Sequence, residues 1–141
     1  MLEAMPDEST TAYLHRVMPL CATLGMRVDV YTPETVVLSL DWSAALSTTG
    51  GLLHGGAIMA LADSAGGACA FLNLPDGAAG TSTIESKTNF LGPVKDGVVS
   101  ATATPLHRGS TTIVVETSVR DERDRLVAKV TQTQAVLRPR P

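Results

Sequence analysis

The chain of 141 residues has two cysteines, 4% aromatic residues and no excess of positive charge. Cys21 and Cys69 lie in apolar stretches, with no CxxC motif and no Cys/His cluster. This pattern predicts reduced core thiols in a cytoplasmic protein, and the scattered histidines and cysteines predict no metal site. A net charge of −3 gives no electrostatic case for binding nucleic acid or an anionic membrane.

No secretory signal is expected from the first residues of the sequence, and its hydrophobic runs are all interrupted. Its first residues, MLEAMPDESTTAYL, carry acidic groups and no basic segment. The longest apolar stretch, residues 55–74, contains Asp63, Ser64 and four glycines. These interruptions favour a buried helix over a membrane span.

Length and composition favour one domain over residues 1–141, since 44% of the residues are hydrophobic and 18% are charged. Residues 1–25 form an expected N-terminal helical segment. Within it, an amphipathic helix over 8–24 is predicted by apolar residues spaced three and four apart: Tyr13, Val17, Leu20 and Leu24. Gly25 would end this helix.

The remaining pattern is a hairpin, a long helix and four strands. The expected strands are rich in Val and Thr and cover residues 26–31, 35–41, 81–91, 97–106, 111–121 and 126–137. A loop over 42–53 precedes the helix over 55–74. One sheet against one helix makes a two-layer α+β domain. Because this helix is apolar on nearly all sides, a second copy of the chain is expected to cover its other face.

The candidate catalytic groups lie at the start of this long helix and within its first half. In His54-Gly55-Gly56, the glycines offer backbone N–H groups where a helix start can hold an anion. Asp63 is the single charged residue of the run AIMALADSAGGACAFL. Burying a carboxylate costs free energy unless it is paired, so an unpaired one in such a run indicates a functional role. An oxyanion donor and a carboxylate on one helix predict acyl-transfer chemistry.

The chain resembles the hotdog-fold thioesterases, and most closely the PaaI-like and 4-hydroxybenzoyl-CoA thioesterase branch. The resemblance spans residues 26–138 and rests on GLLHGG at 51–56, ALAD at 60–63, SKTNFLGP at 86–93 and PLHRGS at 105–110. It implies a curled antiparallel sheet wrapped around one central helix. It also implies hydrolysis of acyl-CoA esters at a site shared across a dimer interface, in a homodimer or homotetramer. Coenzyme A would be part of the substrate, and no cofactor is implied.

Asp63 is our candidate for the catalytic carboxylate, acting as a general base toward water or as a nucleophile. Gly55 and Gly56 would polarise the thioester carbonyl, with Gly55 as the donor in the family pattern. The resemblance gives His54 a supporting role at the loop, and a direct role of His54 in proton transfer stays open as the alternative. Helix geometry favours a shared site independently, because Gly55 and Asp63 are separated by roughly 12 Å of helical rise.

The resemblance is incomplete at two positions. Thr48 stands where relatives often carry Asn or Gln, so its reach toward the thioester or a water is shorter. Gly67 stands where one branch places a hydroxyl, and Thr83 is near the position from which another branch supplies it. Asp63 with Thr83 is therefore closer to the PaaI-like pattern.

Coenzyme A contacts are expected from the turn after the fourth strand, where Ser110 and Thr111 match relatives, and Arg108 is a candidate for a phosphate. Two alternatives stay open: a hydratase or dehydratase acting on acyl thioesters, and a non-catalytic acyl-CoA-binding or regulatory protein. The acyl group also stays open, since Phe71, Phe90, Met59 and Leu53 could line an aryl or an aliphatic pocket.

Overall fold

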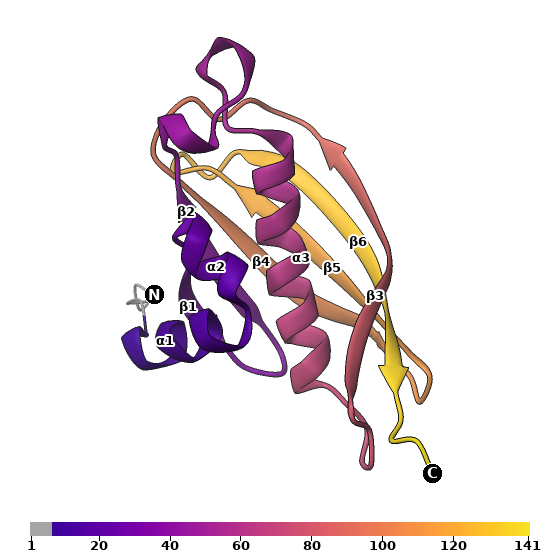
Figure 1. The fold of residues 1–141 in the computed structure, drawn as a ribbon. Coiled ribbons are helices and arrows are strands. Elements are labelled where there is room, and N and C mark those ends of the chain that lie inside the picture. The colour runs from indigo at the N-terminus through magenta and orange to yellow at the C-terminus, as the bar shows by residue number, and fades with distance from the viewer. Residues whose placement is uncertain (1–6) are drawn as a thin grey trace.

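The computed structural model describes residues 7–141 and forms one antiparallel sheet wrapped around a central helix (Figure 1). Residues 1–6 belong to the expected N-terminal segment and lie outside the described residues. The helices are α1 (Glu8–Val17), α2 (Pro19–Leu24) and α3 (Gly55–Leu72). The strands are β1 (Arg27–Tyr31), β2 (Val36–Asp41), β3 (Gly80–Phe90), β4 (Val98–Arg108), β5 (Thr112–Arg120) and β6 (Leu126–Leu137).

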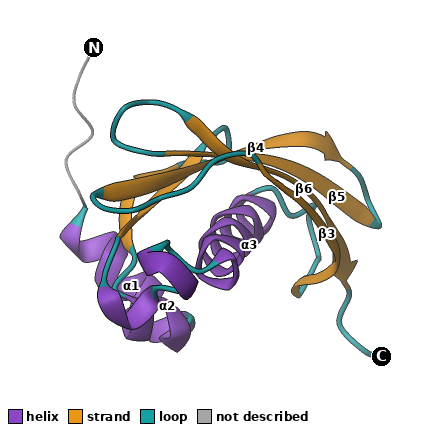
Figure 2. Cartoon of the chain, turned by 90° about the horizontal axis from the view of Figure 1, so that it is seen from above, coloured by secondary structure: helices purple, strands orange, loops and turns teal. Residues whose placement is uncertain are grey.

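The six strands lie in the order β1-β2-β4-β5-β6-β3, and every neighbouring pair is antiparallel. Viewed from above, the sheet curls around α3, which lies in its concave face, while α1 and α2 lie at one side (Figure 2). This is the architecture that the sequence predicted, and β6 covers the predicted range to the residue.

Alternation of side chains along the strands builds the inner face of the sheet. On β2 and β4, Leu38 pairs with Ala101 and Val36 with Ala103, and all four are fully buried. The same inner face continues across β5 and β6 to β3. Two of its positions on β6 are polar and almost fully buried, Gln132 and Gln134.

Helix α3 begins at Gly55, as the sequence predicted, and ends at Leu72, two residues before the predicted end. His54 is its N-cap, and Asn73 is its C-cap. Its buried residues are mostly small: Ala57, Ile58, Leu61, Ala62, Ser64, Ala65, Gly66, Ala68, Cys69 and Ala70. Asp63 is exposed, together with Met59 and Phe71. By length and hydropathy α3 also matches a membrane span, but half of it is buried within the protein.

The expected single helix over residues 8–24 is wrong. The chain forms two helices with a break at Met18, because Pro19 follows, and a proline disfavours helical backbone in the residue before it. The buried residues are Leu14 and Cys21, whereas Val17 and Leu20 are 50% and 57% exposed. The three-and-four spacing therefore predicted the wrong face.

Helix α2 covers part of the α3 face that the sequence assigned to a second copy, and α1 packs against α2 and β1. The thiol of Cys21 on α2 donates to the Ser64 hydroxyl on α3. Asp7 caps α1 by accepting from Ser9 and Thr10, and these hydrogen bonds lower the pKa of Asp7 to about 2. The described part of the N-terminal segment is thus folded into two helices that lie beside α3 (Figure 2).

Strand β3 forms one edge of the sheet, and among residues 7–141 it pairs with β6 alone. The register shifts between Thr83 and Glu85, which marks a bulge at Ile84. Because of this extra residue, Thr83 and Ser86 both lie opposite buried positions of β6, and Ile84 is 64% exposed.

Candidate active site

The start of α3 is organised by His54. The Gly56 N–H donates to His54 Nδ1 over 2.7 Å, while the N–H groups of Ala57 and Ile58 donate to the His54 carbonyl oxygen. Nδ1 is therefore an acceptor, and in the neutral ring the proton is on Nε2. The Gly55 N–H donates to no acceptor within residues 7–141, so Gly55 is the glycine that keeps a donor available at this helix start.

Gly55 is covered by the ring of Phe90 from β3. A Cβ added at Gly55 would lie 3.1 Å from the Phe90 Cζ, which is closer than ordinary van der Waals contact. Phe90 itself is 52% exposed. The ring occupies the space that a side chain at position 55 would need, which explains why a glycine stands here.

The loop before α3 does not bring the Thr48 side chain into the site. The Thr48 N–H donates to the Leu52 carbonyl oxygen over 2.7 Å, and the His54 N–H donates to Leu46. The Thr48 hydroxyl makes no hydrogen bond with any described residue, and it lines none of the pockets beside Asp63 or His54.

Asp63 and Thr83 are brought together, as the sequence predicted. The Thr83 hydroxyl donates to Asp63 Oδ1 over 2.9 Å. Two further residues, which the sequence did not predict, complete this hydrogen-bonded group. Gln132 Nε2 donates to the same Oδ1 over 3.1 Å, and Gln134 Nε2 donates to the Thr83 hydroxyl oxygen over 2.6 Å.

A pocket of about 400 Å³ opens beside this carboxylate, between α1, α3 and β3. Its walls are the side chains of Tyr13, Val17, Met18, Tyr31, Asp63, Ala68, Phe71, Thr81, Ser82, Thr83 and Gln134, together with Gly67. A Cβ at Gly67 would meet nothing within 4 Å, so this glycine leaves open space. Burial raises the pKa of Tyr31, which therefore lines the pocket as a neutral phenol. Asp63 is the one carboxylate in this lining.

Asp63 also borders a second hollow of about 330 Å³ with Met59, Ala60, Thr83 and Ser86. A separate pocket of about 400 Å³ adjoins the start of α3 and includes His54 and Gly56. Of the residues expected around the acyl group, Phe71 and Met59 border Asp63, Phe90 covers Gly55, and Leu53 is buried. The carboxylate and the helix start therefore open into different pockets of one protomer.

The expected coenzyme A contacts lie toward the far end of α3. Arg138 donates to the carbonyl oxygens of Ser110 and of Asp76, which follows α3. The Thr111 carbonyl accepts from Val136 on β6. Arg108 ends β4 beside them. Within one protomer, these residues are not brought together with His54 and Gly55.

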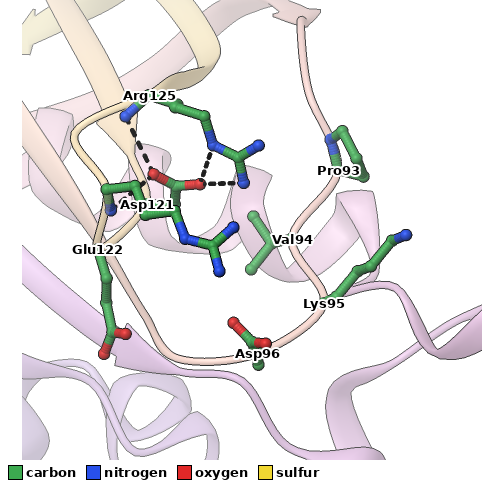
Figure 3. A pocket seen from close by; sticks show the side chains of 8 residues that line it. Pro93, Val94, Lys95, Asp96, Asp121, Glu122 and Arg125 are labelled. Atoms are coloured by element: carbon green, nitrogen blue, oxygen red, sulfur yellow. Dashed lines mark hydrogen bonds and ion pairs between the residues drawn. The ribbon is translucent and has the colours of Figure 1, made fainter.

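A further pocket of about 330 Å³ lies between the loop before β4 and the β5–β6 turn (Figure 3). Asp121 binds the Arg125 side chain and accepts from the Arg123 and Arg125 backbone N–H groups, and the hydrogen bond from the Arg125 side chain lowers the pKa of Asp121. The charged lining is balanced: Lys95, Arg123 and Arg125 against Asp96, Asp121 and Glu122. It has no net charge with which to attract an anionic substrate, and it does not contain Asp63.

Both cysteines are buried and free. Burial raises the pKa of the Cys21 thiol and raises that of Cys69 to about 11. Thiols that stay protonated are poor nucleophiles. Asp63 therefore remains the candidate reactive group beside the pocket.

Known proteins identify the family. The model of the Thioesterase superfamily matches residues 50–128, more than half of the chain. A Bacillus subtilis protein named "Putative esterase ComA2" is 34% identical over 119 residues, which cover 84% of this chain and 94% of that protein.

Solved structures agree with this assignment. Thioesterase HI1161 from Haemophilus influenzae superposes with a TM-score of 0.84 at 25% identity, covering 98% of this chain and 96% of that one. A mutant of thioesterase PA1618 from Pseudomonas aeruginosa gives 0.84 at 26% identity, covering 94% and 95%. The chain belongs to the thioesterase superfamily and has its hotdog fold.

Proposed function

We propose that this protein hydrolyses acyl-CoA thioesters to the free acid and coenzyme A, at a site shared by two copies of the chain. The observation that carries the proposal is the Asp63 carboxylate, held by Thr83 and Gln132 at the mouth of a largely apolar pocket. Membership of the thioesterase superfamily supports the reaction class.

The proposed chemistry uses one donor and one carboxylate. The Gly55 N–H would donate to the thioester carbonyl oxygen and stabilise the oxyanion as it develops. Asp63 Oδ2, which accepts from none of the described residues, would take a proton from a water as the water oxygen bonds to the carbonyl carbon. Collapse of the tetrahedral intermediate then breaks the C–S bond and releases the coenzyme A thiolate, which is protonated afterwards. Direct attack by Oδ2 to form an anhydride is the alternative route.

Geometry supports the sharing of this site. Gly55 and Asp63 lie on one helix with roughly 12 Å of rise between them, too far to act on one carbonyl. An antiparallel second copy would bring its Asp63 toward Gly55. Strand β3 supports this arrangement, because it is a long edge strand with exposed Ile84 and an unpaired side. The proposed assembly is a homodimer, or a homotetramer of two such dimers.

The antiparallel dimer would also place the predicted coenzyme A-binding residues beside the substrate. Ser110, Thr111 and Arg108 lie toward the end of α3 opposite Gly55 in one protomer. In an antiparallel pair, the far end of one helix approaches the start of the other. These residues would then serve the substrate held at the partner's helix start. The acyl group would occupy the pocket beside Asp63, into which Gly67 opens space.

The test is thiol release from aryl-, short- and medium-chain acyl-CoA esters by the purified protein, with Asp63→Asn beside it. Turnover that collapses in the variant while binding persists supports the proposal. Binding of several esters without turnover would instead favour a regulatory acyl-CoA-binding protein. Loss of enone absorbance from an enoyl-CoA without thiol release would favour a hydratase.

A further inference from the structure

The only two glutamines of the chain, Gln132 and Gln134, both stand at the candidate site. They are two residues apart on β6, so their side chains point to the same face of the sheet. Gln132 is 0% exposed and Gln134 is 1% exposed. A buried amide is costly unless it is hydrogen-bonded, so their position needs an explanation beyond the fold.

The charge of Asp63 fixes the direction of every hydrogen bond in this group. An ionised carboxylate can only accept, so the Thr83 hydroxyl must give its hydrogen to Asp63 Oδ1. The Thr83 oxygen is then free to accept from Gln134 Nε2. Gln132 must likewise present Nε2 to Oδ1. Two donors therefore hold Oδ1, and Oδ2 is left without a donor among residues 7–141.

Gly66 on α3 makes room for one of these amides. A Cβ at Gly66 would lie 2.1 Å from Gln132 Oε1, so the amide occupies the space of a side chain at position 66. Gln132 Oε1 is buried and has no hydrogen-bond partner within the described chain. The contact with Asp63 is thus the polar interaction that orients this amide.

We propose that Gln132 and Gln134 are positioning residues for the reaction. They hold Asp63 with Oδ1 fixed and Oδ2 available to the water or the substrate, and Gly66 admits the Gln132 amide to that position. This inference rests on the proposed function. It adds two residues of β6 and one of α3 to a site that the sequence placed on α3 and β3.

The first test replaces one amide by an apolar side chain of similar length. Gln132→Met removes the donor to Oδ1, and we expect kcat for acyl-CoA hydrolysis to fall by about 10- to 100-fold, the scale of a misplaced catalytic group, with KM within about twofold. Gln134→Met acts through Thr83 and should lower kcat less. Thr131→Val, at the exposed neighbouring position of β6, is the matched control and should keep wild-type kcat. Wild-type kcat in Gln132→Met would overturn the proposal.

A second pair of variants separates positioning from folding. Gly66→Ala places a methyl group against the Gln132 amide and should lower both kcat and Tm. Gly66→Ala combined with Gln132→Ala removes the clash, and alanine is the better helix former, so Tm should return to the wild-type value or above. We expect kcat of this double variant to stay low. A double variant with wild-type kcat would overturn the proposal, even if Gln132→Met fails to fold.

The positioning can also be judged without turnover. If the wild-type protein hydrolyses no thioester, the proposed function fails, and a crystal structure of Gln132→Met still tests the geometry. We expect the Asp63 side chain in that structure to occupy more than one rotamer. An unmoved Asp63, still within hydrogen-bond distance of Thr83, would show that Gln132 does not position it.

Discussion

The inner face of the sheet has two parts that are equally buried and chemically different. On β2 and β4, Leu38 and Ala101 pair among other aliphatic side chains. On β6, Gln132 stands between Val115 of β5 and Ser86 of β3 in the pairing register. The aliphatic part needs only close packing, whereas each buried amide needs a partner.

The difference between these two parts of the sheet shows which buried residues serve stability and which serve the proposed reaction. Helix α3 packs against both parts of the face. Toward the aliphatic part it presents a continuous apolar surface, but toward β6 and β3 it presents Gly66 and Asp63. Substitutions in the aliphatic part should therefore change stability, while those in the polar part should change turnover.

The largest effect is expected from Asp63→Asn. The variant keeps the size of the side chain and an oxygen that can accept from Thr83, but it removes the base or nucleophile. Since general-base catalysis contributes about 10²- to 10⁴-fold, we expect kcat to fall by about 1,000-fold. Thiol release measures this loss, and a thermal melt should show little change, because Asp63 is exposed. A variant with more than about half of the wild-type kcat would remove Asp63 from the reaction.

Leu38→Ala tests the aliphatic part. Leu38 is fully buried, and leucine-to-alanine changes in cores cost about 2–5 kcal/mol in the free energy of unfolding. Urea denaturation at one fixed protein concentration measures this, since assembly would make stability depend on concentration. The kcat per folded molecule should stay at the wild-type value. Val37→Ala, at a half-buried neighbouring position, is the control and should cost less. A strong loss of kcat in folded Leu38→Ala would contradict the separation.

Thr83→Val sharpens the comparison within the polar part. Valine has the shape of threonine without the hydroxyl, so Asp63 Oδ1 loses a donor and Gln134 loses its acceptor. We expect kcat to fall by about 10-fold, which is less than for Asp63→Asn, because Gln132 still holds the carboxylate. Thr83→Ser keeps the hydroxyl and should restore most of the activity. Equal kcat for the valine and serine variants would show that the hydroxyl is not used.

Gly67→Leu should change the preference among substrates more than the rate with the best one. The new side chain enters the pocket beside Asp63, where a Cβ meets nothing within 4 Å. Shortening the pocket by a few methylenes should change the ratio of kcat/KM between long and short acyl chains by about 10-fold. Competition between two acyl-CoA esters of different length measures the ratio. An unchanged ratio would place the acyl group elsewhere.

The sequence predicted the fold well because its signals are local. His54 and the glycines mark the start of α3, and Val- and Thr-rich runs bounded by turn residues mark the strands. The N-terminal prediction was wrong because a spacing pattern that continues across Pro19 does not show that the helix breaks at Met18. A helical period alone does not reveal which face is buried.

The polar partners of Asp63 could not be predicted in the same way. Gln132 is 69 positions from Asp63, and polar residues alternating on a strand usually face solvent. The bulge at Ile84, which sets the register of Thr83 against Gln134, has no clear local signal. Asp63 was predicted from its place as the single charged residue of an apolar helix, and Thr83 from the resemblance, and their contact is observed. The joining of two protomers at Gly55 remains a prediction.

The smallest expected effect is a pH dependence of stability from the buried thiol of Cys69. Burial raises the pKa of this thiol to about 11 from an ordinary value of 9.0, against a smaller opposing effect of the Arg108 guanidinium. The folded state therefore favours the protonated thiol. Its contribution to stability is complete below pH 9 and is lost as the pH rises through about 11.

We expect urea denaturation of the wild type between pH 9 and 11 to show a steeper loss of stability than that of Cys69→Ala, with each compared with its own value below pH 9. The Cys21 thiol and Tyr31, whose pKa values are also raised by burial, remain in both proteins and cancel in the comparison. The pH profile of kcat should not distinguish the two proteins, because Cys69 lines none of the pockets beside Asp63. Identical pH slopes of stability would mean that this thiol is not held protonated by the fold. A difference in the pH profile of kcat would show that a buried residue outside the pockets beside Asp63 affects the reaction, which would contradict the separation of stability from turnover.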